Sequence, residues 1–421
     1  MTDTHVDFAG IRLKHPIGVA PQAPFAPVTP RRLADHLLRY IDEGASFVNT
    51  TSIRPELQHP ADKQPTGRFL RVDKGVGSKV SGAIVFTPAE RDRIQHRLEW
   101  GLELIAILRK ELPRGIPLIA NVVHSRPDIE TWVRHARTIE EAGADLIELN
   151  PSCPLDPPMQ SDGEEAEEIV AEGLGDSPSA LSQIVSAVAA AVEVPVGIKF
   201  SPESGYPRLV NAAYRYHKAG ARYVACVNAP MSIAPPDIRR GGRGRYPGFE
   251  ENPFAPIVGP WVRYLAYRNT AAIARFVPDL DIAAVGGIVE GEHVIEALML
   301  GAKTVELSSG ILLKGVPFIR QAVRFLESYM DEMGYQSLDQ IRGLGLQYVK
   351  APSAIDWGMG KLHASIDPHR CNGCGICANN LCFAIRMNGD RPDVDVSTCS
   401  ACSLCIASCP SGAISLVKGR V

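Results

Sequence analysis

The chain has 421 residues, of which 45% are hydrophobic and 22% are charged, with a formal net charge of −3 at pH 7. This is an ordinary globular composition, long enough for two or three domains or for one large barrel with a small module. The balanced charge gives no basic field for nucleic acid or an anionic membrane. No apolar stretch reaches the ~20 residues of a spanning helix, and MTDTHVDFAG lacks signal-peptide features. We therefore expect a cytoplasmic protein.

Short apolar, β-branched runs recur along roughly the first 310 residues and predict strands. Most are continuous rather than alternating, as in strands that are buried on both faces. The eight runs are 16–20, 46–50, 117–122, 145–150, 196–200, 223–228, 281–287 and 304–309. Helical stretches such as 130–142 and 179–192 lie between them. Several of the helices end at a glycine (Gly143, Gly220 and Gly301), which is a natural helix C-cap.

Eight such βα units predict an α/β fold, a (β/α)8 TIM barrel. A doubly wound open sheet is the alternative, but no G-x-G-x-x-G follows the first strand, and the glycines of 241–248 have the wrong spacing. In these barrels the chemistry lies at the carboxyl ends of the strands. Those ends carry Asn49, Thr50, Thr51, Asn121, Asn150, Lys199, Asn228, Gly286, Gly287, Ser308 and Ser309. We expect them to line one pocket.

Cysteines are concentrated at the end of the chain. We expect the barrel to occupy 1–324, a helical linker 325–365 and a small ferredoxin-like domain 366–421. Eight of the ten cysteines fall between Cys371 and Cys409. In a cytosolic protein such clustering indicates a metal site rather than disulfides.

The spacing of these cysteines is typical of iron–sulfur ligands. The second run, Cys399-x2-Cys402-x2-Cys405-x3-Cys409-Pro410, is the bacterial ferredoxin pattern, in which the fourth cysteine of each run binds the other cluster. This predicts two [4Fe–4S] clusters. Their ligands would be Cys371, Cys374, Cys377 and Cys409 for one, and Cys399, Cys402, Cys405 and Cys382 for the other.

Two alternatives stay open for the cysteine module. Zinc also binds CxxC pairs, although the ligand runs contain no histidine. The first run has four residues before Cys382, not three, and Phe383 stands where the pattern has proline. One cluster with a spare thiol is therefore the second alternative.

Together, these features carry a family resemblance that covers nearly the whole chain. The barrel, with NPSCP after its fourth strand, and the two-cluster tail resemble the flavin half of dihydropyrimidine dehydrogenase, especially its bacterial iron–sulfur catalytic subunit. Over the barrel the chain is also similar to class 1 dihydroorotate dehydrogenases. The stretches that carry the resemblance are 8–20, 119–154, 196–202, 227–230, 284–288 and 305–315.

The resemblance implies FMN in the barrel. It places Lys199 beside the N1–C2 carbonyl edge of the flavin, where a cation favours the negative charge of the reduced ring. The alternative for Lys199 is a core lysine with a carboxylate partner. Gly286, Gly287, Ser308 and Ser309 would bind the FMN phosphate. The resemblance further implies that Asn121, Asn150 and Asn228 line the ring and substrate, and that Ala20, Asn49, Thr50 and Gly259 also contact the cofactor.

The same resemblance gives Cys153 a role as the acid/base opposite flavin N5. When hydride moves at one carbon of a C–C bond, the adjacent carbon needs a proton moved. A thiol with a pKa of ~8.5 can donate that proton near neutral pH. The alternative is a buried hydrophobic cysteine, which is what we expect of Cys226.

The sequence also departs from the family. Asn49 or Thr50 stands where relatives carry a lysine, 78–86 lacks the pyrimidine-binding asparagine, and Leu155 follows the SCP motif. Loss of substrate-binding polar groups indicates a changed substrate. Two insertions flank the site: an acidic one at 162–173 and one that carries Arg239, Arg240, Arg243 and Arg245. They are either solvated loops, or a lid and an anion-binding arm.

The resemblance thus implies an FMN- and iron–sulfur-dependent oxidoreductase that acts on a polarised C=C or CH–CH bond of a small cyclic substrate. Dihydropyrimidine dehydrogenase proper and an electron-transfer subunit of a larger complex are the alternatives. No nucleotide-binding fingerprint is present, so a ferredoxin or a separate NAD(P)H-oxidising flavoprotein subunit would supply electrons. Relatives imply a homodimer or a heteromer.

Overall fold

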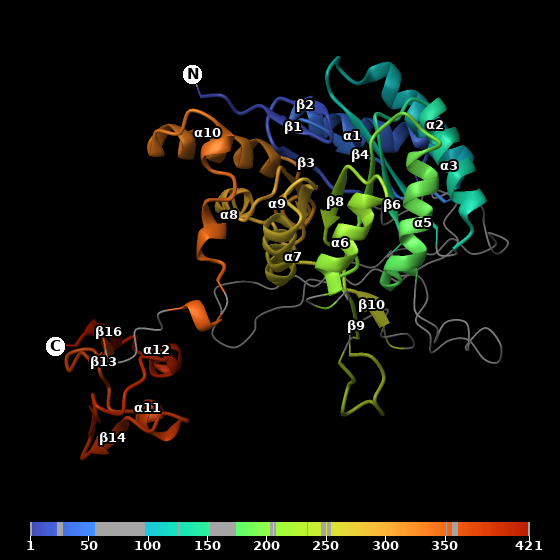
Figure 1. The fold of residues 1–421 in the computed structure, drawn as a ribbon. Coiled ribbons are helices and arrows are strands. Elements are labelled where there is room, and N and C mark those ends of the chain that lie inside the picture. Colours follow the sequence, from blue (N-terminus) through green and yellow to red (C-terminus); the bar gives the residue numbers. More distant parts are fainter. Residues whose placement is uncertain are drawn as a thin grey trace. The chain divides into compact units, whose positions relative to one another are not determined.

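The computed structural model divides into two compact units, Met1–Tyr348 and Val349–Val421 (Figure 1). Within these, the structure describes residues 2–22, 28–54, 97–124, 127–151, 174–202, 205, 208–233, 235–245, 250, 254–350, 352–355 and 361–419. The boundaries predicted above, at 324/325 and 365/366, stay predictions. No helix in these ranges is long and apolar enough to cross a bilayer.

Eight parallel strands close into a barrel in the first unit, which confirms the predicted TIM-barrel fold. Each observed strand lies within or one residue beyond a predicted run. The strands are β3 (Ile17–Val19), β4 (Val48–Asn49), β5 (Leu118–Val123), β6 (Leu146–Asn150), β7 (Val196–Lys199), β8 (Tyr223–Cys226), β11 (Asp281–Val285) and β12 (Thr304–Leu307). Every residue of β5 to β8 and of β12 is buried, which explains why their sequences do not alternate.

Amphipathic helices surround the strands, as the alternation of runs predicted (Figure 1). The helices of the barrel unit are α1 (Pro30–Asp42), α2 (Leu98–Glu111), α3 (Ile129–Glu141), α5 (Pro178–Ala189), α6 (Arg208–Lys218), α7 (Arg263–Phe276), α8 (Glu292–Met299), α9 (Ser309–Lys314) and α10 (Phe318–Met333). Two of them begin at a side-chain cap: the Thr29 side chain accepts the Arg32 N–H at α1, and Asp128 accepts the Thr131 N–H at α3.

The predicted glycine C-caps are present after α3, α6 and α8. Gly143, Gly220 and Gly301 have φ values of +105°, +106° and +101°. Glycine reaches this region without the steric cost of a Cβ atom, so each helix can end and turn directly into the next strand. These turns fix where each following strand begins relative to its helix.

A hairpin that the strand prediction missed closes the amino-terminal end of the barrel. It consists of β1 (Val6–Phe8) and β2 (Ile11–Leu13). The Phe8 ring stacks on Tyr223, the first residue of β8, with centroids 4.8 Å apart. The Tyr223 ring in turn occupies the space beside Gly197, where a Cβ atom would lie 2.2 Å from it. This end is therefore filled by aromatic side chains.

A second unpredicted hairpin lies beyond the carboxyl end of β8. Strand β9 (Met231–Ile233) pairs antiparallel with β10 (Phe254–Pro256). Between β10 and α7 a short 3-10 helix, η4 (Pro260–Val262), brings the chain back to the barrel. The described residues of this unit also include the 3-10 turns η3 (Leu174–Asp176), η5 (Leu338–Gln340) and η6 (Leu344–Tyr348).

The described residues of the second unit form two small antiparallel sheets and two short helices. Its elements are η7 (Pro352–Ala354), β13 (Leu362–Ile366), α11 (Ile376–Asn379), β14 (Ile385–Asn388), β15 (Arg391–Val394), α12 (Leu404–Ser408) and β16 (Ile414–Lys418). Strands β13 and β16 pair antiparallel, as do β14 and β15. This architecture fits the predicted ferredoxin-like fold. Its small core includes Ala364, Ile385 and Ile414, together with Cys377 and Cys405.

Candidate active site

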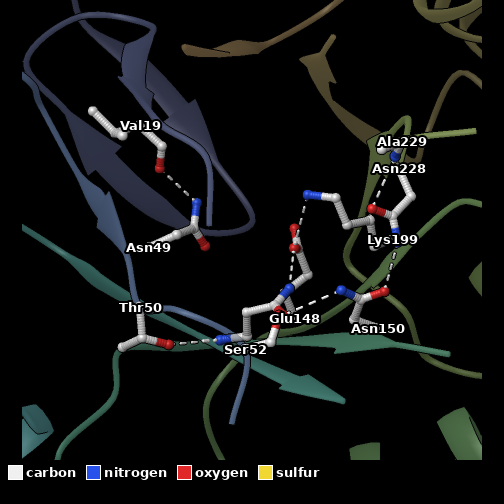
Figure 2. A network of polar contacts seen from close by, with 10 residues as sticks. Val19, Asn49, Thr50, Ser52, Glu148, Asn150, Lys199, Asn228 and Ala229 are labelled. Atoms are coloured by element: carbon white, nitrogen blue, oxygen red, sulfur yellow. Dashed lines mark hydrogen bonds and ion pairs between the residues drawn. The ribbon is translucent and has the colours of Figure 1, made fainter. Parts of the chain in front are cut away.

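Asparagine side chains from β5, from β6 and from the residues just after β8 form a hydrogen-bonded chain at the carboxyl end of the barrel (Figure 2). The Asn228 amide donates to Asn150 Oδ1 (3.0 Å), and the Asn150 amide donates to Asn121 Oδ1 (3.2 Å). The Asn121 amide then donates to Glu148 Oε1 at 2.6 Å. The Asn228 end is fixed by the Ala229 N–H, which donates to Asn228 Oδ1 at 3.0 Å. The structure thus brings together the three asparagines singled out in the sequence.

Lys199 lies beside this chain and shares its last acceptor. Its Nζ atom is 3.4 Å from Glu148 Oε1, and both side chains are buried. Register places Asn121 directly opposite Glu148 on β5 and β6, so strand pairing itself builds the contact. Isolated charges in a protein interior are costly, and this pairing offsets part of the cost. The carboxylate partner of Lys199, which the alternative of a core lysine predicted, is thus present.

Glu148 was not among the residues selected from the sequence. It stands two positions before Asn150 in DLIELN, on the same face of β6, because strand side chains alternate. A lone acid in an otherwise apolar buried run was the signal that could have revealed it. The same reasoning applies to Glu306, which stands two positions before Ser308 in TVELSS.

Glu306 is a second fully buried acid in the barrel. Neither of its carboxylate oxygens has a hydrogen-bond partner among the described residues, although the Asn49 amide lies near enough to favour the charged form. Burial, and then repulsion from Glu148, raises the pKa of Glu306 to about 8 against the attraction of Lys199. Burial and the nearby Glu148 therefore favour the neutral form of Glu306 in the folded protein.

The other predicted residues at the end of β4 are also buried. Asn49 donates its amide to the Val19 carbonyl oxygen at 3.0 Å. The Thr50 hydroxyl accepts the Asn121 N–H at 3.1 Å. Ser52, which the sequence analysis did not select, donates its hydroxyl to Asn121 Oδ1 at 2.8 Å. Asn49 and Thr50 thus support the strand ends, and no charged side chain replaces the lysine of relatives at these two positions.

The glycines after β11 form a tight turn against the start of η4. Gly286 and Gly287 have φ values of +124° and +71°, and Gly259 has +126°. A Cβ atom on Gly287 would lie 2.5 Å from the Arg263 nitrogen and 2.8 Å from the Pro260 oxygen. Only glycine fits this close approach of two backbones.

The serine pair lies next to that turn. Ser309 begins α9, and a Cβ atom on the following Gly310 would lie 2.8 Å from the Ile288 carbonyl oxygen. The Ala20 N–H donates to the Leu307 oxygen at 3.1 Å, which ties the end of β3 to the residue before Ser308. The structure therefore gathers Ala20, Gly287 and Ser309 at adjoining strand ends.

The eight tail cysteines line two separate cavities in the second unit. One cavity is lined by Cys371, Cys374, Cys377 and Cys409, together with Pro410 and Gly375. The other is lined by Cys382, Cys399, Cys402 and Cys405, with Leu381 and Phe383 at its edge. Each cavity thus combines three cysteines of one run with the fourth cysteine of the other.

The loops around both cavities fit an iron–sulfur cluster. Gly373 and Gly375 in the first run, and Ala401 and Ser403 in the second, all have positive φ. Backbone N–H groups point at sulfur: Ala413 N lies 3.3 Å from Cys409 Sγ, and Ala364 N lies 3.4 Å from Cys399 Sγ. Such bonds favour thiolate ligands. No histidine lines either cavity among the described residues.

Several predicted features lie outside the described residues. These are Cys153 and Leu155, the segment 78–86 and the acidic insertion 162–173. Cys226 is fully buried, and burial raises the pKa of its thiol, as expected of a core cysteine. Arg239 and Arg240 are exposed on the turn between β9 and β10, so their anion-binding role stays a prediction.

The sequence of the barrel matches the dihydroorotate dehydrogenase family over residues 5–330. The chain belongs to this family. Membership confirms the predicted resemblance and implies FMN as the cofactor of the barrel, while the cysteine cavities of the second unit fit iron–sulfur binding.

Individual relatives are similar at modest identity. The "NAD-dependent dihydropyrimidine dehydrogenase subunit PreA" of Escherichia coli (strain K12) is 27% identical over 290 residues, which cover 67% of this chain and 66%, just under two thirds, of the relative. The "Putative dihydroorotate dehydrogenase A (fumarate)" of Aeropyrum pernix is 33% identical over 232 residues (54% of this chain, 67% of the relative). The chloroplastic "Dihydropyrimidine dehydrogenase (NADP(+))" of Arabidopsis thaliana is 22% identical over 353 residues (82% and 78%). These names denote oxidoreductases.

The buried acid of β12 gives the barrel a specific pH dependence. The folded state binds the Glu306 proton up to a pKa of about 8, whereas the unfolded chain releases it near the ordinary value of 4.5. The free energy of unfolding therefore falls as the pH rises through this window. Glu306→Gln cannot ionise, so at about pH 8 it should unfold with a free energy a few kcal/mol higher than the wild type, and at about pH 5 with nearly the same value.

Tryptophan fluorescence can follow this unfolding, because Trp100 and Trp132 are buried in the barrel unit. Glu103→Gln is the matched control, since Glu103 is exposed on α2. It should leave the unfolding free energy unchanged at both pH values. A Glu306→Gln effect of equal size at both pH values would contradict the raised pKa.

Proposed function

We propose that the protein is an FMN- and iron–sulfur-dependent oxidoreductase that acts on a polarised C=C or CH–CH bond of a small cyclic substrate. The observation that carries this proposal is the buried Lys199, which shares the Glu148 acceptor with a chain of asparagine amides in a barrel of the dihydroorotate dehydrogenase family. Each of the two cavities is lined by four cysteines, and iron–sulfur clusters bound there would supply electrons one at a time.

The residues present fit FMN. Lys199 would face the N1–C2 carbonyl edge of the ring, and Asn121, Asn150 and Asn228 would contact the ring and the substrate. The backbone around Gly286, Gly287, Ser308 and Ser309 would hold the phosphate, with Ala20, Asn49, Thr50 and Gly259 completing the contacts. When bound, FMN supplies reversible hydride transfer at N5.

The side chains of this chain orient the reactants and hold charge. Lys199 provides the positive charge that opposes negative charge on the reduced ring, and Glu148 keeps the ammonium in place at 3.4 Å. The asparagine chain has a fixed direction, because Glu148, when ionised, can only accept. Its amides therefore present one arrangement to a ligand, without rotamer disorder.

Cys153 completes the proposed chemistry. Its thiol would donate a proton to the carbon next to the one that receives hydride, and would take that proton back in the reverse reaction. Pro151 and Pro154 flank the turn in sequence and restrict its backbone. Cys153 is thus the proposed acid/base, and Lys199 is the proposed electrostatic partner of the flavin.

We further propose two [4Fe–4S] clusters with the ligand sets that line the two cavities. The first set is Cys371, Cys374, Cys377 and Cys409, and the second is Cys382, Cys399, Cys402 and Cys405. Electrons would enter from a ferredoxin or from a separate NAD(P)H-oxidising flavoprotein subunit. The name of the Escherichia coli relative, a subunit of an NAD-dependent enzyme, supports a partner of this kind. The proposed assembly is a cytoplasmic homodimer or heteromer.

Dihydropyrimidine dehydrogenase proper is a second candidate, and the names of the Escherichia coli and Arabidopsis relatives favour it. Against it stand the departures of the sequence from the resembled family, in which Asn49 or Thr50 occupies the expected position of a lysine. Steady-state reduction of uracil and thymine with a low-potential donor separates these two candidates. A relay subunit, the third alternative, would show no flavin oxidation by any small substrate.

The cofactor content is the direct test of the proposal. Anaerobic purification should give protein with about one bound FMN per chain, and with iron and sulfide for two clusters. A visible spectrum with flavin and iron–sulfur absorption, together with iron, sulfide and flavin assays, measures this. Protein without FMN would overturn the proposed function whatever its iron content.

Removal of the Cys153 thiol should slow the chemistry without removing the cofactor. Cys153→Ala and Cys153→Ser should retain FMN and lose turnover by at least ~100-fold, as expected when a general acid is lost. Stopped-flow recovery of the flavin band measures the step. Cys226→Ala, which removes a fully buried thiol, is the control and should turn over normally. Near-normal turnover in both Cys153 variants would discard the acid/base role.

Double variants test how the cysteines are divided. Cys371→Ser and Cys409→Ser line one cavity, so each single variant should lose about half of the iron, and the double variant no more than either one. Cys371→Ser combined with Cys399→Ser should lose nearly all iron, because the two cysteines line different cavities. Iron assays on anaerobic protein measure both. Equal losses in the two double variants would contradict the division.

A further inference from the structure

Among the described residues, two buried acids and one buried lysine lie in the interior of the barrel. Glu148 and Glu306 are fully buried, and Lys199 is 5% exposed. With all three ionised, this group would carry a net negative charge in a medium where an unpaired charge is costly. One proton shared by the two carboxylates balances the lysine.

The contacts assign that proton to Glu306. Glu148 Oε1 accepts the Asn121 amide at 2.6 Å and lies 3.4 Å from Lys199 Nζ, and both contacts stabilise a carboxylate. Neither Glu306 oxygen has a hydrogen-bond partner among the described residues. The neutral form of Glu306 avoids an unpaired buried charge, whereas an ionised Glu306 would compete with the cofactor for the Lys199 charge.

The surroundings of Glu306 contain few other groups that titrate. Charged or titratable side chains that face it are Glu148 from β6, Lys199 from β7 and Tyr223 from β8. Register on its two neighbouring strands places Gly18 and Val285 beside it. On the outer side of β12, helix α8 directs His293 toward Arg263 and Glu296 toward Tyr267. The proton affinity of Glu306 is therefore raised first by burial and then by Glu148, and it is lowered by Lys199, so a change in the charge near Lys199 changes it.

We propose that Glu306 couples proton uptake to reduction of the flavin that Lys199 faces. This inference rests on the proposed function. For every two electrons and one proton that the flavin accepts, giving its anionic reduced form, the ionised Glu306 binds one further proton from solvent. The electrons come from the proposed iron–sulfur clusters or, in a titration, from dithionite.

The coupling follows from charge alone. Lys199 stabilises the ionised form of Glu306, and it would also stabilise negative charge on the reduced ring. Negative charge added to the ring offsets the effect of Lys199 on Glu306, so reduction raises the proton affinity of Glu306. By linkage, a neutral Glu306 makes reduction more favourable by the same factor. Because burial already raises the pKa of Glu306 to about 8, the coupling acts above neutral pH. Glu306 is thus a positioning residue, which influences reduction of the flavin through the charge of Lys199.

Redox titration of the holoprotein at pH values from about 6 to about 10 tests this coupling. Above about pH 8, one extra proton per two electrons makes the reduction equilibrium fall by a further tenfold per pH unit, or about 30 mV. Wild type should show this steeper segment, and Glu306→Gln should lack it. Thr304→Val is the control: it removes a buried hydroxyl without a partner on the same strand, and should keep the steeper segment.

Infrared difference spectra of the wild type give a second readout that needs no variant. Above about pH 8, reduction should increase the carbonyl band of a protonated carboxylic acid, and this band should shift in heavy water. Absence of the band change, or equal slopes in wild type and Glu306→Gln with FMN bound, would overturn this inference alone. Absence of bound FMN from the wild type would overturn the proposed function with it.

Discussion

A buried carboxylate that can only accept hydrogen bonds fixes the polar interior of this barrel. Glu148, in its ionised form, can pair only with the donor side of the Asn121 amide. The Asn121 oxygen must then accept from Asn150, and the Asn150 oxygen must accept from Asn228. At the other end the Ala229 N–H can only donate, so both ends impose the same direction. Lys199 supplies the counter-charge. The proposed cofactor site depends on this one orientation of four side chains.

Most of the barrel could be predicted from its strands. Continuous apolar runs and glycine-ended helices follow from burial on both faces and from helix capping, which are local properties. The two antiparallel hairpins, β1–β2 and β9–β10, escaped prediction, because their runs of three residues are too short to show a period. Helix α10 continues through Leu326 and Met330, which are buried in the barrel core, within the segment predicted to be a linker.

The polar residues at strand ends were easier to find than their partners. Asn121, Asn150, Lys199 and Asn228 end their strands and stand out in the sequence. Glu148 and Glu306 lie inside apolar runs, where a single acid is readily taken for an outward-facing residue. Which face it occupies depends on strand register and barrel closure, and neither can be determined from one sequence. The grouping of the tail cysteines was easier to predict, because it follows from their spacing in the sequence and not from strand register.

The direction of the asparagine chain limits how this barrel can acquire a new specificity. A substitution at any one link would leave a neighbouring donor or acceptor of the chain without its partner, which is costly for a buried polar group. Evolution can therefore change such an interior only by several simultaneous replacements, whereas the loops above it can vary one residue at a time. Diversity among proteins with this interior should accordingly be concentrated in the segments that join strands to helices.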